Sequence, residues 1–128
     1  MSDVSALQVQ CRKMVADPDD FKAGHYMFAS GVATFPPLGS EPNPQTPFRH
    51  NIVFDIALSR QPEDDAVVHV APAWFGASGS ADFIHYNFKE PTVSVVGNNV
   101  RVNVAVEIGG RFPWLQAVSF FCVARARR

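Results

Sequence analysis

The chain has 128 residues, of which 47% are apolar, with eleven Phe, ten Pro and a net charge of −1. This length is typical of one domain with its own core, and the mixture of aromatic residues and strand breakers favours a β-sandwich over a helical bundle. The near-neutral charge, without a basic stripe, argues against a nucleic-acid partner. The first residues contain no long apolar run. We therefore expect no membrane insertion, and a protein that is cytoplasmic or exported without a classical signal peptide.

The amino-terminal segment has the spacing of an amphipathic helix. Its apolar side chains recur at intervals of three and four residues and so form a stripe: Val4, Leu7, Cys11, Met14 and Val15. Ser2 or Asp3 can cap such a helix, and Pro18 ends it because the proline ring cannot continue a helix. We interpret residues 1–25 as a helical extension and residues 26–128 as the β-sandwich domain.

The remainder of the chain alternates apolar runs with turn residues, which predicts an antiparallel sandwich of six to seven strands. Gly31, inside the first run at residues 25–35, indicates a bulge or a close backbone approach. The proline-rich stretch 36–47 cannot donate a continuous ladder of hydrogen bonds, so we expect a surface loop there. Pro72, inside the run 66–75, indicates an edge strand or a bulge.

Breaks in the later runs predict where strands end. The segment K-E-P at residues 89–91 interrupts one strand before T-V-S-V-V resumes it, and G-N-N at residues 97–99 marks a turn that accepts left-handed backbone geometry. The two glycines at residues 109–110 are expected to reverse the chain into a hairpin with an aromatic strand that starts near Trp114.

The strand before this expected hairpin alternates strictly. Its apolar side chains occupy every second position: Val100, Val102, Val104, Val106 and Ile108. A period of two predicts one buried face and an opposite face that carries Arg101, Asn103 and Glu107. These polar side chains could bind a polar ligand that also has an apolar face.

The sequence contains no catalytic or metal-binding signature. Four histidines lie on separate elements without the spacing of a metal site: His25, His50, His69 and His85. No nucleophile elbow, phosphate loop or ordered triad is present, so we expect neither an enzyme nor a cofactor. A hydrolase that uses His69 or His85 with nearby acids is a less favoured interpretation. Cys11 and Cys122 have no secretory framework around them and are expected to be reduced.

Two tryptophans stand at the ends of predicted strands. Trp74 precedes a glycine-rich connection, and Trp114 follows the G-G-R turn. Aromatic rings at such positions can stack on the apolar face of a sugar while neighbouring polar groups hold its hydroxyls. The same rings could instead cap the core or contact another subunit, and the sequence leaves both interpretations open.

The order of these strands resembles the H-type lectin family, which includes the snail agglutinins and the carboxy-terminal domain of the discoidins. The similarity is carried by S-G at residues 30–31, by N-I-x-F at residues 51–54 and by V-S-F-F at residues 118–121, and it spans roughly residues 26–125. The resemblance implies a six-stranded antiparallel sandwich that assembles as a trimer. It also implies shallow sites for galactose or N-acetylgalactosamine near the protomer boundaries.

In that family the sugar site uses an Asp after the central strand, an Arg that opens the next strand, and an aromatic and a polar residue on the late turn. This sequence has no Asp in the corresponding loop, Asp82 where the Arg is expected, and E-I-G-G-R at the late turn. Asp82, Glu107 and Arg111 nevertheless occupy comparable regions. We therefore expect a rearranged ligand-binding site from these three residues, with Trp74 and Trp114 as its stacking face.

These observations predict a non-enzymatic, carbohydrate-binding lectin that presents shallow sugar sites on a homo-oligomer, with a trimer favoured. The expected partners are glycans of the galactose or N-acetylgalactosamine type. The alternative is a structural or assembly module, in which the aromatic rims make protein contacts and no sugar binds.

Overall fold

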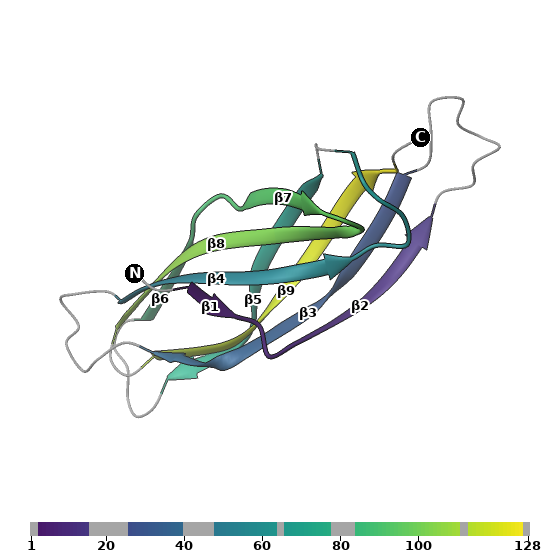
Figure 1. Cartoon of the computed structure of the whole chain (residues 1–128). Helices are drawn as coiled ribbons and strands as arrows, with labels where there is room; N and C mark the ends of the chain where they lie inside the picture. Colours follow the sequence, from purple (N-terminus) through teal and green to yellow (C-terminus); the bar gives the residue numbers. More distant parts are fainter. Residues whose placement is uncertain are drawn as a thin grey trace.

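The computed structural model describes residues 3–15, 26–39, 48–63, 66–77, 84–110 and 113–126. Within these ranges the chain is all-β, with nine strands in two sheets and no helix (Figure 1). The two sheets pack face to face around a shared core, which confirms the predicted β-sandwich. The number of strands is larger than the predicted six to seven. No described helix is long and apolar enough to cross a membrane.

One sheet, called sheet A, contains five strands. Their order is β1 (Asp3–Ser5), β4 (Phe48–Ala57), β8 (Asn99–Gly110) and β6 (Ile84–Phe88), and β7 (Thr92–Val96) also pairs with β8. The other sheet, called sheet B, has the order β2 (Gln8–Val15), β3 (Tyr26–Gly39), β9 (Pro113–Arg125) and β5 (Val67–Ala77). All paired strands are antiparallel except β1 and β4, which run parallel.

The predicted amino-terminal helix is wrong. Residues 3–5 and 8–15 form β1 and β2, and β2 pairs with β3 in unbroken register from Gln8 to Val15. The side chains that pack against the core from β2 are Val9 and Cys11, which are separated by two positions. Two members of the expected helical stripe, Leu7 and Met14, are instead 70% and 71% exposed. The period of two along β2 therefore decides which side chains are buried.

Figure 1 shows the two sheets as two layers, and the buried side chains of the core come from the strands of both. All five alternating apolar residues of β8 are fully buried, as the sequence predicts: Val100, Val102, Val104, Val106 and Ile108. Burial of a Val or Ile side chain contributes about 1.5–3 kcal/mol, so β8 is a main source of stability. Phe54 joins the two layers, because its ring lies 6.3 Å from that of Phe35 on β3 and 5.3 Å from that of Phe120 on β9.

The predicted hairpin of the last two strands is also wrong. β8 belongs to sheet A and β9 to sheet B, so the chain changes sheets between them. The physical reason is that β8 already has neighbours on both edges, with β4 on one side and β6 and β7 on the other. The predicted turn at residues 97–99 is confirmed, since Gly97 has φ 60° and joins β7 to β8.

The interruption at residues 89–91 is confirmed as well. Phe88 is opposite Val106 and Thr92 is opposite Asn103, so β6 and β7 line the same edge of β8 in succession. Between them the main-chain N–H of Lys89 still donates to β8, at 2.9 Å from the oxygen of Ala105.

Two predictions about special residues in sheet B hold. Gly31 lies directly opposite Cys11 on β2, where a Cβ atom would collide with the main chain of Gln10 and Cys11. This is the close backbone approach that the sequence indicates. Pro72 lies on β5, an edge strand, and the register shifts between Pro72 and Trp74.

Two further expectations concern the proline-rich stretch and the cysteines. Residues 36–39, expected in a loop, belong to the end of β3 after a register shift, and residues 40–47 lie outside the described ranges. Cys11 and Cys122 are both free thiols, as expected.

Candidate functional site

The outer face of sheet A carries rows of polar side chains that face one another across β4 and β8. The register places Asp55 opposite Arg101, Val53 opposite Asn103, and Arg49 opposite Glu107. Side chains on alternate positions of a strand share one face, and the intervening residues of β4 and β8 are buried in the core. The outward position of Arg101, Asn103 and Glu107, predicted from the sequence, is therefore confirmed.

Asp55 and Arg101 form a bidentate ion pair. The Nε of Arg101 donates to Oδ1 of Asp55 at 2.9 Å, and Nη2 donates to Oδ2 at 3.2 Å. Two parallel hydrogen bonds fix the plane of the guanidinium relative to the carboxylate. The hydrogen bond to Asp55, followed by its charge, raises the pKa of Arg101 above its usual value. The pair keeps free donor and acceptor positions because both side chains remain partly exposed.

A second polar cluster continues along the same face toward β1. The parallel pairing of β1 with β4 places Asp3 opposite Asn51. The Asn51 amide nitrogen donates to Asp3 Oδ1 at 2.7 Å and lies 3.4 Å from Asn103 Oδ1. These contacts orient the carboxylate of Asp3 and the amide of Asn103 beside the ion pair.

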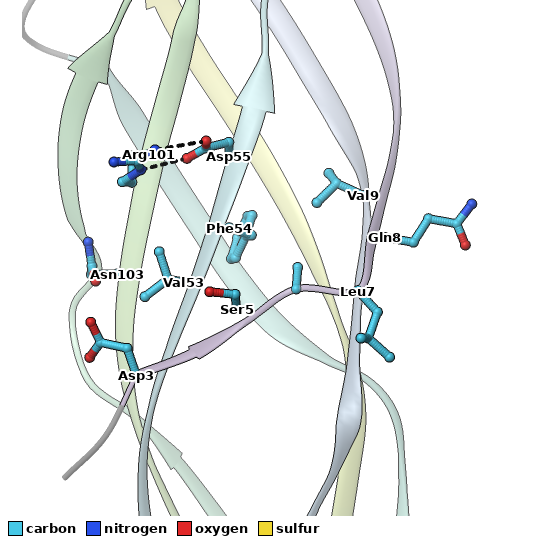
Figure 2. A pocket seen from close by; sticks show the side chains of 11 residues that line it. Asp3, Ser5, Leu7, Gln8, Val9, Val53, Phe54, Asp55, Arg101 and Asn103 are labelled. Carbon is cyan, nitrogen blue, oxygen red and sulfur yellow. Dashed lines mark hydrogen bonds and ion pairs between the residues drawn. The ribbon is translucent and has the colours of Figure 1, made fainter.

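These residues line a groove that exists because β1 is short. β1 pairs with β4 over three residues, and the chain then crosses to sheet B as the N–H groups of Ala6 and Leu7 donate to Val53 of β4 and Thr34 of β3. The crossing leaves a hollow of about 580 Å³ between β4 and the start of β2 (Figure 2). Its lining comes from three segments, residues 3–9, 53–55 and 101–103: Asp3, Ser5, Ala6, Leu7, Gln8, Val9, Val53, Phe54, Asp55, Arg101 and Asn103.

The groove has a polar side and an apolar side. Figure 2 shows the pair of Arg101 and Asp55 on one side, with Asn103 and Asp3 below it, and the side chains of Leu7 and Val9 on the other. Carboxylate and amide oxygens accept hydrogen bonds, and guanidinium and amide nitrogens donate them. The groove can therefore hold a ligand that has several hydroxyl groups and a non-polar surface.

The described residues contain no candidate metal-binding cluster. No group of three His, Cys, Asp or Glu side chains within them could hold a metal ion. His69 lies on β5 of sheet B and His85 on β6 of sheet A, so the two histidines considered for a hydrolase are on separate sheets.

The structure brings together only part of the predicted site. Trp74 and Trp114 contact each other edge to face, with ring centroids 6.0 Å apart and planes at 89°. Glu107, with an 18% exposed side chain, binds Arg49 Nε at 2.8 Å on the outer face of sheet A, whereas the tryptophans belong to sheet B. Because the neighbours of Glu107 and Trp114 along their strands are buried, these two side chains point to opposite outer faces. Asp82 and Arg111 lie outside the described ranges.

The tryptophan pair is part of an aromatic corner that sequence analysis did not identify as such. The indole of Trp114 covers Gly76, where a Cβ atom would lie only 2.7 Å from Cζ2 of the ring. Phe75 contacts Tyr86 of sheet A, with ring centroids 5.3 Å apart. The corner therefore links the edge strand β5 to β9 of its own sheet and to β6 of sheet A.

Sequence reasoning also missed two residues that line the groove, Asp3 and Asp55, and Asn51, which binds Asp3. Asp55 could have been found, since it alternates with the apolar residues Phe54 and Ile56 and so had to face outward. Asp3 carried no such signal, because its position in the site depends on a parallel pairing with a strand that is distant in sequence.

Comparisons with protein-family models, with curated proteins and with solved structures find no match for this chain.

Proposed function

We propose that this protein is a non-enzymatic, carbohydrate-binding lectin and that its sugar site is the groove between β4 and the crossing from β1 to β2. The observation that carries the proposal is the composition of this groove. Oriented carboxylate, amide and guanidinium groups lie on one side, and Leu7 and Val9 lie on the other. Sugars present the same combination, with hydroxyl groups along their edges and C–H groups on their faces.

The charges in the groove favour a neutral ligand. The Arg101 guanidinium is already paired with Asp55, so it offers directed hydrogen bonds without an uncompensated positive charge. Asp3 is bound by the amide of Asn51 and presents its second oxygen as an acceptor. A hydroxyl can donate to a carboxylate and accept from a guanidinium or amide, whereas a phosphate or sulfate would be repelled by the two carboxylates.

The resemblance to H-type lectins supports galactose or N-acetylgalactosamine as the first sugars to test, and a homotrimer as the first assembly to look for. A single shallow site of this kind binds weakly, on the order of millimolar, which is about −4 kcal/mol. Presentation of several copies on one oligomer would raise the avidity without any new contact.

Titration calorimetry with galactose and N-acetylgalactosamine, together with a glycan array, tests the proposal. Asn103→Ala is expected to lower the affinity at least roughly tenfold, because it removes an amide that faces the groove. Asn87→Ala is a matched control, since Asn87 lies on β6 of the same sheet and outside the groove. The proposal fails if the folded protein binds no glycan, or if Asn103→Ala and Asn87→Ala bind alike.

An assembly module is the second candidate, and the aromatic corner favours it. Trp74 and Phe75 are 53% and 49% exposed although they are large and apolar, and both lie on β5, an edge strand of sheet B. Exposed aromatic side chains beside a free strand edge are typical of protein contacts. Light scattering of the wild type and of Trp74→Ala separates the candidates. The assembly module is supported if the wild type binds no sugar and the folded Trp74→Ala variant loses the oligomer, whereas a variant that keeps both the oligomer and sugar binding contradicts it.

A further inference from the structure

The outer face of sheet B differs in charge from that of sheet A. The four strands of sheet B contain no Asp or Glu within their bounds, and β2 carries Arg12 on its outer face, opposite to the face of Val9 and Cys11 that packs against the core. In sheet A, by contrast, acidic and basic side chains are matched in ion pairs such as Asp55 with Arg101. The strands of sheet B therefore supply no carboxylate to balance the positive charge of Arg12.

A hollow on this face is built around a short side chain. The register aligns Arg12 of β2, Ser30 of β3 and Phe121 of β9 in one row, and the next row begins with Met14 and Phe28. Because Ser30 is much shorter than its neighbours, a groove of about 360 Å³ remains above it. Its lining is Arg12, Lys13, Met14, Phe28, Ala29, Ser30 and Phe121.

The walls of this hollow are apolar and open to solvent. Phe121 is 45% exposed, and Met14 and Phe28 extend the apolar surface along the neighbouring strands. Large apolar side chains on an outer sheet face cost free energy in water unless something covers them. The volume is at the small end of the range, from about 300 Å³, in which small-molecule sites are found.

The positively charged side chain of Arg12 lies at the rim of these apolar walls. Arg12 makes no hydrogen bond or ion pair with any residue in the described part of the chain, and its register partner Ser30 carries a hydroxyl that can donate. A guanidinium beside a hydroxyl is a suitable partner for a carboxylate or sulfate. The same arrangement disfavours a second copy of this face, since that would bring two uncompensated Arg12 side chains together.

We propose that this hollow, the Ser30 groove, binds a free anionic amphiphile: a molecule with one carboxylate or sulfate and a short apolar chain. The anion lies between Arg12 and Ser30, and the chain packs on Met14, Phe28 and Phe121. This site is separate from the sugar groove, because it lies on the other sheet and shares none of its lining residues. The two proposals can therefore fail independently.

Calorimetric titration with sodium decanoate below its micelle concentration tests the inference. We expect saturable binding of one decanoate per chain, and no measurable binding of decyltrimethylammonium, which has the same chain and the opposite charge. Butanoate should bind at least roughly a hundredfold more weakly, because each buried CH₂ contributes about 0.8 kcal/mol.

Three variants locate the site. Arg12→Gln should weaken decanoate binding roughly tenfold or more, since it removes a charge-assisted hydrogen bond. Ser30→Leu should abolish binding because it fills the hollow, and its side chain points to solvent, so the fold is retained. Arg49→Gln is the matched control on the outer face of sheet A and should bind decanoate as the wild type does.

Several results would overturn the inference. One such result is equal binding of the cationic and anionic amphiphiles, and another is unchanged decanoate binding in both Arg12→Gln and Ser30→Leu. A third is an oligomer of the wild type that Ser30→Leu disrupts and decanoate does not affect, because the hollow would then be a contact between copies of the chain. Binding to vesicles of phosphatidylserine and phosphatidylcholine without binding of free decanoate would also overturn it, because the partner would then be a membrane surface.

Discussion

Tyr86 of β6 and Trp114 of β9 join the two sheets, since the Tyr86 hydroxyl lies 2.7 Å from the main-chain oxygen of Trp114. The same hydroxyl lies 2.8 Å from the main-chain oxygen of Gly76 on β5, so its single hydrogen is shared between two acceptors. Burial raises the pKa of Tyr86 above 10.0, against the opposing effect of the hydrogen bonds to Gly76 and Trp114. The phenol therefore stays protonated and able to donate at neutral pH.

Tyr86→Phe should destabilise the protein by about 1 kcal/mol, because two partly buried carbonyls lose their donor while the ring contact with Phe75 is kept. Urea unfolding measures the change. Tyr26→Phe is the comparison, since the Tyr26 hydroxyl accepts from the Arg125 side chain, which can turn to water instead. Equal losses in the two variants would contradict a special role for the link between the sheets.

Gly31→Ala should destabilise the protein by about 1–3 kcal/mol, the usual cost of forcing extra atoms into a packed place. The added methyl would meet the Gln10 carbonyl and the Cys11 Cα, so β2 must move away from β3. Faster hydrogen exchange confined to the β2 and β3 amides would show this. Gly97→Asn is the control, because Gly97 is in a turn with open space around it and Asn accepts its φ of 60°. A Gly31→Ala protein as stable as this control would refute the prediction.

Stability should fall in alkaline solution because of Cys122. Burial, with a smaller contribution from the nearby Cys11, raises the pKa of the Cys122 thiol from 9.0 to about 11. The unfolded chain releases this proton at lower pH than the folded protein does, so the contribution is complete below pH 9 and is lost as the pH rises toward 11. Unfolding free energies measured from pH 8 to 11 should decline less steeply in Cys122→Ala. The same slope in both proteins would exclude this thiol as the cause.

Trp74→Ala should reduce stability by no more than about 1.5 kcal/mol, since it removes an exposed edge-to-face contact. Trp114→Ala should cost more, because the Trp114 indole also covers Gly76. Chemical denaturation followed by circular dichroism compares the two variants. The reverse order would mean that Trp74 is covered in solution, for example by another subunit.

Sequence reasoning succeeded where the signal was local. The alternation along β8, the turn at Gly97 and the edge position of Pro72 all depend on a few adjacent residues, and each is confirmed. It failed where pairing between distant segments decides the structure. A spacing of three and four residues suited a helix at residues 4–15, but the free edge of β3 accepts this segment as a strand. β8 and β9 likewise do not pair with each other, because both edges of β8 are already paired with β4 and β6.

The candidate site follows the same division. Arg101 and Asn103 could be assigned to an outer face from their own strand alone. Their partners could not, because Asp3 and Asn51 are 48 positions apart and meet only through the parallel pairing of β1 with β4. Glu107 lies on a different sheet from Trp74 and Trp114 because the chain changes sheets between β8 and β9.

The pairing of β3 with β9 also bears on how the protein is made. Tyr26 lies opposite Arg125, so the central pair of sheet B joins segments from opposite ends of the domain. During translation β9, the second neighbour of β3, is absent until residues 113–125 have been synthesised, whereas β4, β7 and β8 can already pair. Contacts between such distant segments slow folding and prolong the exposure of apolar strands. Synthesis of the last strand is therefore the step at which a nascent chain would most need a chaperone.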